Sequence, residues 1–152
     1  MTEETAIWDH CTSSAVRRAA RRLGQLYGSY FDDAGLNGTQ FSLLSQIAAS
    51  GEPALKVLAE AMVMDLSALG HTLKPLIRDG YVELIADTKD RRVKRARLTA
   101  AGISKQNELL SRWQQAQDRF DHTFGKEQSA EIRRVLALIS SSEFATAFNE
   151  KP

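Results

Sequence analysis

Two short runs rich in β-forming residues interrupt a chain that is otherwise patterned for helices. Residues 81–86 and 93–98 flank the polar segment Asp-Thr-Lys-Asp-Arg-Arg at positions 87–92. Because this segment is too long for a two-residue turn, the pattern predicts a β-hairpin with a longer, exposed loop. At such an exposed tip, Lys89, Arg91 and Arg92 cannot pack against a hydrophobic core. The hairpin therefore projects positive charge into water.

The charge of the chain is distributed unevenly. At 152 residues and 43% hydrophobic residues, it is long enough for one domain with a core, or for a small domain with an extended dimerisation arm. The net charge of +1 says little about partners. Between residues 66 and 105, however, nine cations stand against four anions. A basic segment in a chain that is otherwise near neutral favours a local surface that binds a polyanion. The alternative is an ordinary charged surface.

Several classes of protein find no support in the sequence. Cys11 is the single cysteine, so no intramolecular disulfide is expected. The acidic first residues resemble no signal peptide, and no run of about 18 apolar residues predicts a membrane span. A cytoplasmic location is the default expectation. The sequence shows no phosphate loop, nucleophile elbow or metal-ligand spacing, so we expect no enzyme, no cofactor and no metal site.

The segment before the hairpin predicts a series of helices. Helical spacing predicts one long helix over residues 5–31 and a second over 40–49, with Thr39 as its N-cap. Arg17, Arg18, Arg21 and Arg22 could contact DNA phosphate, pair with a partner subunit or form a solvated face. Residues 54–56 could form a short strand that pairs with the hairpin.

Two short helices separated by a tight turn precede the hairpin. They are predicted at 57–62 and from Ser67, as N-cap, to about residue 79, with a bend at Pro75. This order is a helix-turn-helix followed by a β wing, which predicts DNA binding. We expect five leucine and isoleucine side chains to form the buried side of the second helix: Leu66, Leu69, Leu73, Leu76 and Ile77. The candidate DNA contacts on the helix and wing are Ser67, Ala68, His71, Thr72, Lys74, Arg78, Lys89, Arg91, Arg92 and Lys94.

The end of the chain predicts more helix than a winged helix alone requires. Thr99 is placed to cap a helix over 100–124, and a last helix is predicted over 127–148. With the first helix, these apolar segments suggest a two-fold dimer, and a monomeric helical cap is the alternative. The expected fold is mainly α with a small β-hairpin wing. Residues 1–33 and 100–148 form the dimerisation region, and 36–99 form the winged helix-turn-helix lobe.

Several motifs together resemble the MarR family of bacterial transcription regulators. The resemblance covers nearly the whole chain in element order. It rests on three groups of residues: the wing and its exit (Asp90-Arg91-Arg92, Leu98-Thr99 and Gly102); the recognition helix and its end (Asp65-Leu66-Ser67, Leu73-Lys74-Pro75-Leu76 and Arg78-Asp79-Gly80-Tyr81-Val82); and the first inter-helix turn (Ala34-Gly35-Leu36 and Thr39-Gln40-Phe41).

The resemblance implies a homodimeric, DNA-binding regulator, most often a repressor, that responds to a ligand or an oxidant. It also implies that the wing-tip Asp90 holds Arg92, whose guanidinium enters a minor groove. Asp90 could equally serve as a turn former. A two-fold dimer predicts a roughly palindromic operator with half-sites about one helical turn apart. Gly70-His71 stands where many members have Thr-Arg, so the family's base preference does not carry over.

Two modes of regulation remain open at this point. A small aromatic or phenolic effector could bind between the dimerisation helices and the DNA-binding lobe, with Trp8, His10, Phe41 and Trp113 as wall residues. Aromatic residues at such spacing also serve as core. Alternatively, Cys11 beside His10 could sense oxidants, although an isolated cysteine is more often inert packing. A winged helix used for docking to another protein is a third possibility.

Overall fold

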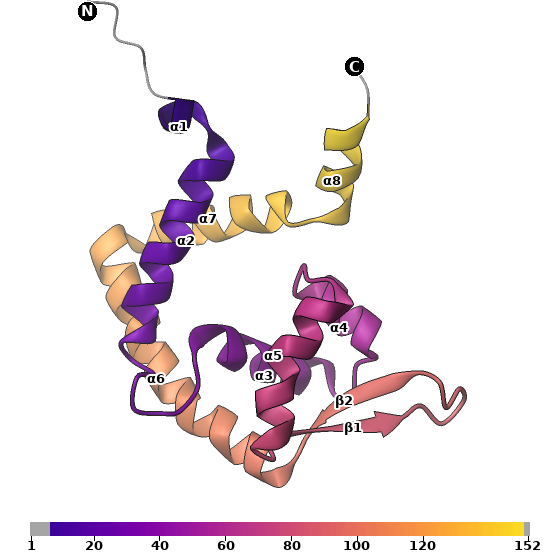
Figure 1. The fold of residues 1–152 in the computed structure, drawn as a ribbon. Coiled ribbons are helices and arrows are strands. Elements are labelled where there is room, and N and C mark those ends of the chain that lie inside the picture. Colours follow the sequence, from indigo (N-terminus) through magenta and orange to yellow (C-terminus); the bar gives the residue numbers. More distant parts are fainter. Residues whose placement is uncertain (1–6, 151–152) are drawn as a thin grey trace, which may run out of the picture.

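The computed structural model describes residues 7–150 and, within α1, leaves the side chains of Ile7 and Trp8 outside the description. The fold is mainly helical with one two-stranded antiparallel hairpin, as the sequence predicts (Figure 1). The elements in chain order are α1 (Ile7–His10), α2 (Thr12–Gly28), α3 (Gly38–Ser50), α4 (Leu55–Ala61), α5 (Leu66–Arg78), β1 (Val82–Ala86), β2 (Lys94–Leu98), α6 (Ala100–Phe124), α7 (Lys126–Ile139) and α8 (Ser142–Asn149).

The hairpin has the position and length that its β-forming runs predict. β1 pairs with β2 from Val82 opposite Leu98 to Ala86 opposite Lys94. The segment before α4 adds a short third partner, because Ala54 bridges Arg95 and Ala96 donates a hydrogen bond to the Pro53 carbonyl (3.0 Å). The expected strand over 54–56 is thus reduced to one bridge, since Leu55 already begins α4.

Helix α3 lies at the centre of the core. It packs against α2, α4, α5, α6 and β2, and its Leu43, Leu44 and Ile47 are fully buried. Burying a side chain of this size stabilises the fold by about 1.5–3 kcal/mol relative to leaving it in water. Figure 1 shows the hairpin beside α5, while α2 runs alongside the far part of α6, and α7 turns away from the end of α6 and leads to α8.

Both terminal helices are interrupted, so the predictions of single helices over 5–31 and 127–148 were wrong. Cys11 is extended (φ −88°, ψ 105°) and separates α1 from α2, which ends at Gly28. At the other end Ser141 is extended and caps α8, so the chain turns between α7 and α8. In both places a small polar side chain accepts a backbone N–H at a new helix start, an alternative that apolar periodicity does not register.

Two of the three expected N-caps were also wrong. Asn37 caps α3 through a reciprocal pair with Gln40, and Asp65 caps α5 by accepting from the Ala68 amide (2.7 Å). Asn37 and Asp65 each stand two residues before the expected Thr39 and Ser67, and Asn and Asp cap a helix at least as well as Thr and Ser. Thr99 does cap α6, as predicted, by accepting from the Gly102 amide (3.0 Å).

The recognition helix α5 buries a narrower stripe than expected. Leu69, Leu73 and Leu76 are buried, but Leu66 is 58% exposed and Ile77 is 37% exposed. The two exposed residues lie at or near the ends of the helix. Pro75 lies within α5, which continues to Arg78. None of the helices within residues 7–150 has the length and apolar character to cross a membrane.

Gly102 marks the tightest approach between the wing and α6. A Cβ atom built there would lie 2.0 Å from the Tyr81 carbonyl oxygen. The same carbonyl accepts a hydrogen bond from the Thr99 amide (3.1 Å), which leaves it little freedom to move. The first turn of α6 can therefore meet the start of the hairpin only where the side chain is a hydrogen atom.

Gly102→Ala is expected to lower the free energy of unfolding by on the order of 1–3 kcal/mol, because the new methyl group overpacks a fixed backbone contact. Gly70→Ala is the matched control, since a Cβ there would meet no described atom within 4 Å. It should raise stability by about 0.5–1 kcal/mol, the usual gain of alanine over glycine in a helix. Urea unfolding followed by circular dichroism measures both values. Equal stability of the two variants would contradict the close packing at Gly102.

Candidate nucleic-acid interface

The wing tip is held by two aspartates that organise the loop around them. Asp90 accepts hydrogen bonds from the Arg92 amide (3.0 Å), from Arg92 Nε (3.1 Å) and from Arg92 Nη2 (3.1 Å). Asp87 accepts from the Lys89 amide (2.9 Å). Both are local side-chain turns of the kind that Asp forms readily. The Arg92 side chain is nonetheless 92% exposed, so the pair presents its guanidinium to solvent in a restricted orientation.

The Asp90 carboxylate is ionised across the neutral pH range. Hydrogen bonds from Arg92, first from its side chain and then from its backbone, hold the pKa of Asp90 below its ordinary value. Because the pKa is lowered in the folded state, the pairing is complete above the ordinary range of aspartate and is lost only as pH falls through the depressed value. The geometry of the tip should thus not vary with pH near neutrality.

Two other arginines of the hairpin brace the wing instead of projecting from it. Arg95 donates to Asp87 (3.0 Å) and to the Glu52 carbonyl (2.8 Å). Arg97 lies between the carboxylates of Glu83 (2.8 Å) and Glu52 (3.3 Å). Part of the basic third is therefore neutralised internally. Of the predicted wing contacts, Lys89, Arg91 and Lys94 are exposed and form no ion pair within residues 7–150.

The exposed face of α5 carries most of the predicted helix contacts. Ser67, Ala68, His71 and Lys74 are exposed. Thr72 is half-buried, and its hydroxyl donates back to the Ala68 carbonyl (3.1 Å). Arg78, at the far end of the helix, is paired with Asp79 (2.9 Å) and is 73% exposed. The structure thus gathers small and hydrogen-bonding groups at the N-terminal half of α5, where groove-reading side chains are found in helix-turn-helix proteins.

A groove joins this helix to the wing. It has a volume of about 350 Å³ and lies between α4, α5 and the wing residues before β2. Leu66, Leu69, Leu73 and Val93 supply apolar wall, and Lys56, Arg92 and Lys94 supply cations. Lys56 was not among the predicted contacts, because residues 54–56 suggested a strand. Its position in the first turn of α4 could be recognised only once Leu55 was known to begin that helix.

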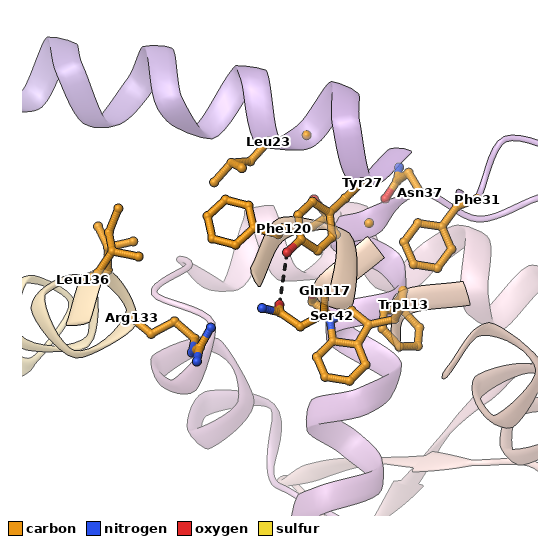
Figure 2. A pocket seen from close by; sticks show the side chains of 15 residues that line it. Leu23, Tyr27, Phe31, Asn37, Ser42, Trp113, Gln117, Phe120, Arg133 and Leu136 are labelled. Carbon is orange, nitrogen blue, oxygen red and sulfur yellow. Dashed lines mark hydrogen bonds between the residues drawn. The ribbon is translucent and has the colours of Figure 1, made fainter. Parts of the chain in front are cut away.

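A second, larger cavity of about 550 Å³ lies between α2, α3, α6 and α7. Of the predicted wall and sensor residues, Phe41 and Trp113 line it, whereas Cys11 and His10 do not. Figure 2 shows Tyr27 donating to Gln117 Oε1 (3.0 Å), with Arg133 reaching in from α7. Burial, followed by the charge of Asp121, raises the pKa of Tyr27. Sequence periodicity did not identify Tyr27, Gln117 or Arg133, because they come from three separate helices.

A polar network extends behind this cavity. Gln117 donates to Asp121 (2.8 Å), and Arg133 donates to the fully buried Ser129 hydroxyl (2.6 Å). Ser129 in turn bonds Asp121, so α6 and α7 are joined at their shared corner. The network fixes the position of Arg133 at the rim of the cavity.

Cys11 and His10 are not among the residues that line the cavity. Cys11 is half-buried and caps α2, with its Sγ accepting from the Ser14 amide (3.4 Å), and His10 is exposed. The side chain of Trp8 lies outside the part of the chain that the structure describes. Within residues 7–150, no three His, Cys, Asp or Glu side chains gather as a metal site would require.

The fold and the interface described above are similar to those of known proteins. The model of the MarR family matches residues 36–94, from just before α3 to the first residue of β2. The M. tuberculosis transcriptional regulator MosR, crystallised with DNA, is 31% identical to this chain and has a TM-score of 0.80. The match covers 92% of this chain and 99% of MosR. The chain belongs to the MarR family. MosR, the relative that shares this fold at 31% identity, is a transcriptional regulator.

Two more distant structures share the MarR-family fold. The transcriptional repressor CouR, bound to a DNA duplex, is 19% identical over 91% of this chain and 98% of its own, with a TM-score of 0.80. A MarR variant from E. coli, complexed with operator DNA, is 19% identical over 84% of this chain and 91% of its own, with a TM-score of 0.75. A search of curated proteins gave no significant match. The winged helix-turn-helix lobe and its flanking helices are thus those of a MarR-family regulator.

Proposed function

We propose that this MarR-family chain is a repressor that binds a roughly palindromic operator as a homodimer and leaves it when a small aromatic ligand binds. The observation that carries the proposal is the Asp90–Arg92 pair, which presets an almost fully exposed guanidinium at the wing tip. A guanidinium held in this way loses little rotamer freedom on entering a narrow, electronegative minor groove.

The rest of the interface follows from the exposed groups around that tip. Small and hydrogen-bonding side chains of α5 would meet base edges in a major groove: Ser67, Ala68, His71 and Thr72. Lysines and arginines around the groove and at the helix end would contact phosphates: Lys56, Lys74, Arg78, Lys89, Arg91 and Lys94. The apolar wall of Leu66 and Val93 lies between these cations, so sugar and base-methyl surfaces could rest against it.

Arg92→Ala is expected to weaken operator binding by about 1–3 kcal/mol, roughly ten- to a hundredfold, with little change in Tm because the tip is exposed. Arg134→Ala is the matched control, since Arg134 is an exposed arginine of α7 paired with Glu131. Fluorescence anisotropy with DNA from the region upstream of its own gene measures both affinities. Binding of the wild type should also fall steeply with salt. Unchanged affinity of Arg92→Ala would remove the wing from the mechanism, and salt-insensitive binding would favour the protein-docking alternative.

The homodimer is supported by the apolar surface of the terminal arms. Among the large side chains that the arms expose are Leu26, Leu138, Phe144 and Phe148, with Phe148 at 78%. A monomer rarely leaves so many large apolar groups exposed to water. We therefore assign residues 1–33 and 100–148 to dimerisation and 36–99 to the DNA-binding lobe. Two lobes related by a two-fold axis would match two half-sites.

The protein is expected to sediment as a dimer at micromolar concentration. Joint replacement of Phe144 and Phe148 by serine should shift it toward monomer, because it removes two aromatic groups that the partner would cover. Thr146→Ser on the same helix α8 is the control and should leave the dimer intact. Analytical ultracentrifugation distinguishes the cases. A wild-type monomer would instead support a helical cap.

The aromatic ligand is assigned to the 550 Å³ cavity because of its walls. Phe41, Trp113 and Phe120 offer aromatic surface, while Tyr27 and Arg133 offer a hydroxyl and a cation. The cavity touches α3, the centre of the DNA-binding lobe, and also α2, α6 and α7. A ligand wedged there would change how each lobe sits on the dimerisation helices, and hence the distance between the two recognition helices.

One observation favours oxidant sensing as a second candidate. Cys11 Sγ accepts the Ser14 amide at the N-terminus of the 17-residue helix α2. Oxidation at this cap would disturb the junction between α1 and α2 without involving the cavity.

Release from operator DNA separates these two modes. Benzoate is expected to release the wild type, and Arg133→Ala should require at least tenfold more benzoate because the carboxylate loses its cation. The effector model predicts that hydrogen peroxide has no such effect. If peroxide releases the wild type but not Cys11→Ser, and benzoate releases neither, the oxidant model replaces it. An electrophoretic mobility shift assay on one DNA fragment measures release by benzoate and release by peroxide.

A further inference from the structure

An exposed leucine opens the recognition helix. Leu66 is the first residue of α5, directly after the Asp65 cap, and it is 58% exposed although its spacing from Leu69 and Leu73 predicts burial. The core is filled from the next two turns, so Leu66 adds little to it. Its neighbour Ser67 is also exposed, in the part of the helix from which helix-turn-helix proteins contact base edges. Leu66 is therefore placed to meet DNA.

Gly70, one turn later, leaves an open space beside Leu66. It lies inside α5 and has no positive φ, and a Cβ atom built there would have no described side chain within 4 Å. A glycine inside a helix lowers stability relative to alanine, so the fold gains nothing from it. Close approach of another molecule is the common reason for a glycine at such a position.

Both residues line the groove between α5 and the wing. Leu66 and Gly70 are four positions apart in the helix, so they lie on one face and form an apolar step with a gap. Lys56, Arg92 and Lys94 line the same groove and are exposed. Cations around an apolar step suit DNA, because phosphates surround a major groove in which the thymine C5-methyl group is the apolar feature.

We infer that Leu66 and Gly70 form a notch that receives the C5-methyl group of a thymine, so that each half-site contains a T·A pair recognised by apolar contact. A polar base edge pressed against Leu66 would lose its water without gaining a hydrogen bond, whereas a methyl group gains by burial. The inference rests on the proposed function in placing α5 in a major groove. It adds the base that is read and the two residues that read it.

Deoxyuridine tests the notch because it lacks the methyl group of thymidine and keeps the same base pairing. The probe is a duplex that the wild-type chain enriches from a pool of random sequences, with deoxyuridine replacing thymidine at one position at a time. At one position in each half-site, the wild type should bind the thymine duplex about fourfold more tightly, which is the effect of burying one methyl group. Fluorescence anisotropy measures the two affinities.

Variants of Leu66 assign this preference to its side chain. Leu66→Ala should bind the thymine and uracil duplexes equally, with the salt dependence of the wild type because no phosphate contact is lost. Leu66→Met should retain the preference, since it restores an apolar side chain of similar size. Leu110→Ala is the matched control, because Leu110 is an exposed leucine of α6 outside the groove, and it should keep the wild-type ratio.

Gly70→Leu fills the notch from its other side. It should weaken binding to the thymine duplex by about tenfold or more and abolish the preference over uracil. Its Tm should not fall, because leucine is a better helix former than glycine and the position is open. A fall in Tm, or a thymine preference kept by Gly70→Leu, would contradict the open notch.

The outcomes separate this inference from the proposed function. If the wild type enriches a site but binds its thymine and uracil forms equally at every position, or if Leu66→Ala keeps the preference, the inference is overturned and DNA binding stands. If no sequence is enriched from the pool, the proposed function fails and the inference fails with it.

Discussion

The burial of α3 is the constraint on which the rest of the structure depends. Leu43, Leu44 and Ile47 are fully buried, and the helix packs against α2, α4, α5, α6 and β2. A helix that is apolar around much of its circumference must be covered on several sides. Those covering elements include α5, β2 of the wing and the long helix α6. One burial event thus holds together the parts that would read DNA and the parts that would bind a partner or an effector.

The arginines of the hairpin have two different roles: some hold the wing in place, and one is exposed at its tip. Arg95 and Arg97 are neutralised by Asp87, Glu83 and Glu52, which ties the hairpin to the segment before α4. Arg92 is paired only with Asp90, on the same loop, and remains exposed. Exposed ion pairs of this kind add little stability. Their contribution is orientation, which matters for a group that must enter a groove in one direction.

Local patterns predicted the hairpin and the long helix α6 well because both depend on neighbouring residues. The Thr99 cap, the β-forming runs on either side of the tip and the apolar spacing of α6 are short-range signals. The breaks at Cys11 and Ser141 and the caps at Asn37 and Asp65 were missed. At the two caps, neighbouring polar side chains compete for the amide groups of one helix start, and at the two breaks a side-chain cap competes with continuation of the helix. Periodicity alone cannot decide which one does.

The residues by themselves determined the fold class, the basic wing tip and the candidate DNA contacts, because a helix or a hairpin loop displays its side chains by spacing alone. Only the tertiary structure decided which arginines brace the wing, that Lys56 joins the groove, and that Tyr27, Gln117 and Arg133 meet around one cavity. In each case residues far apart along the chain come together because the helices pack around α3.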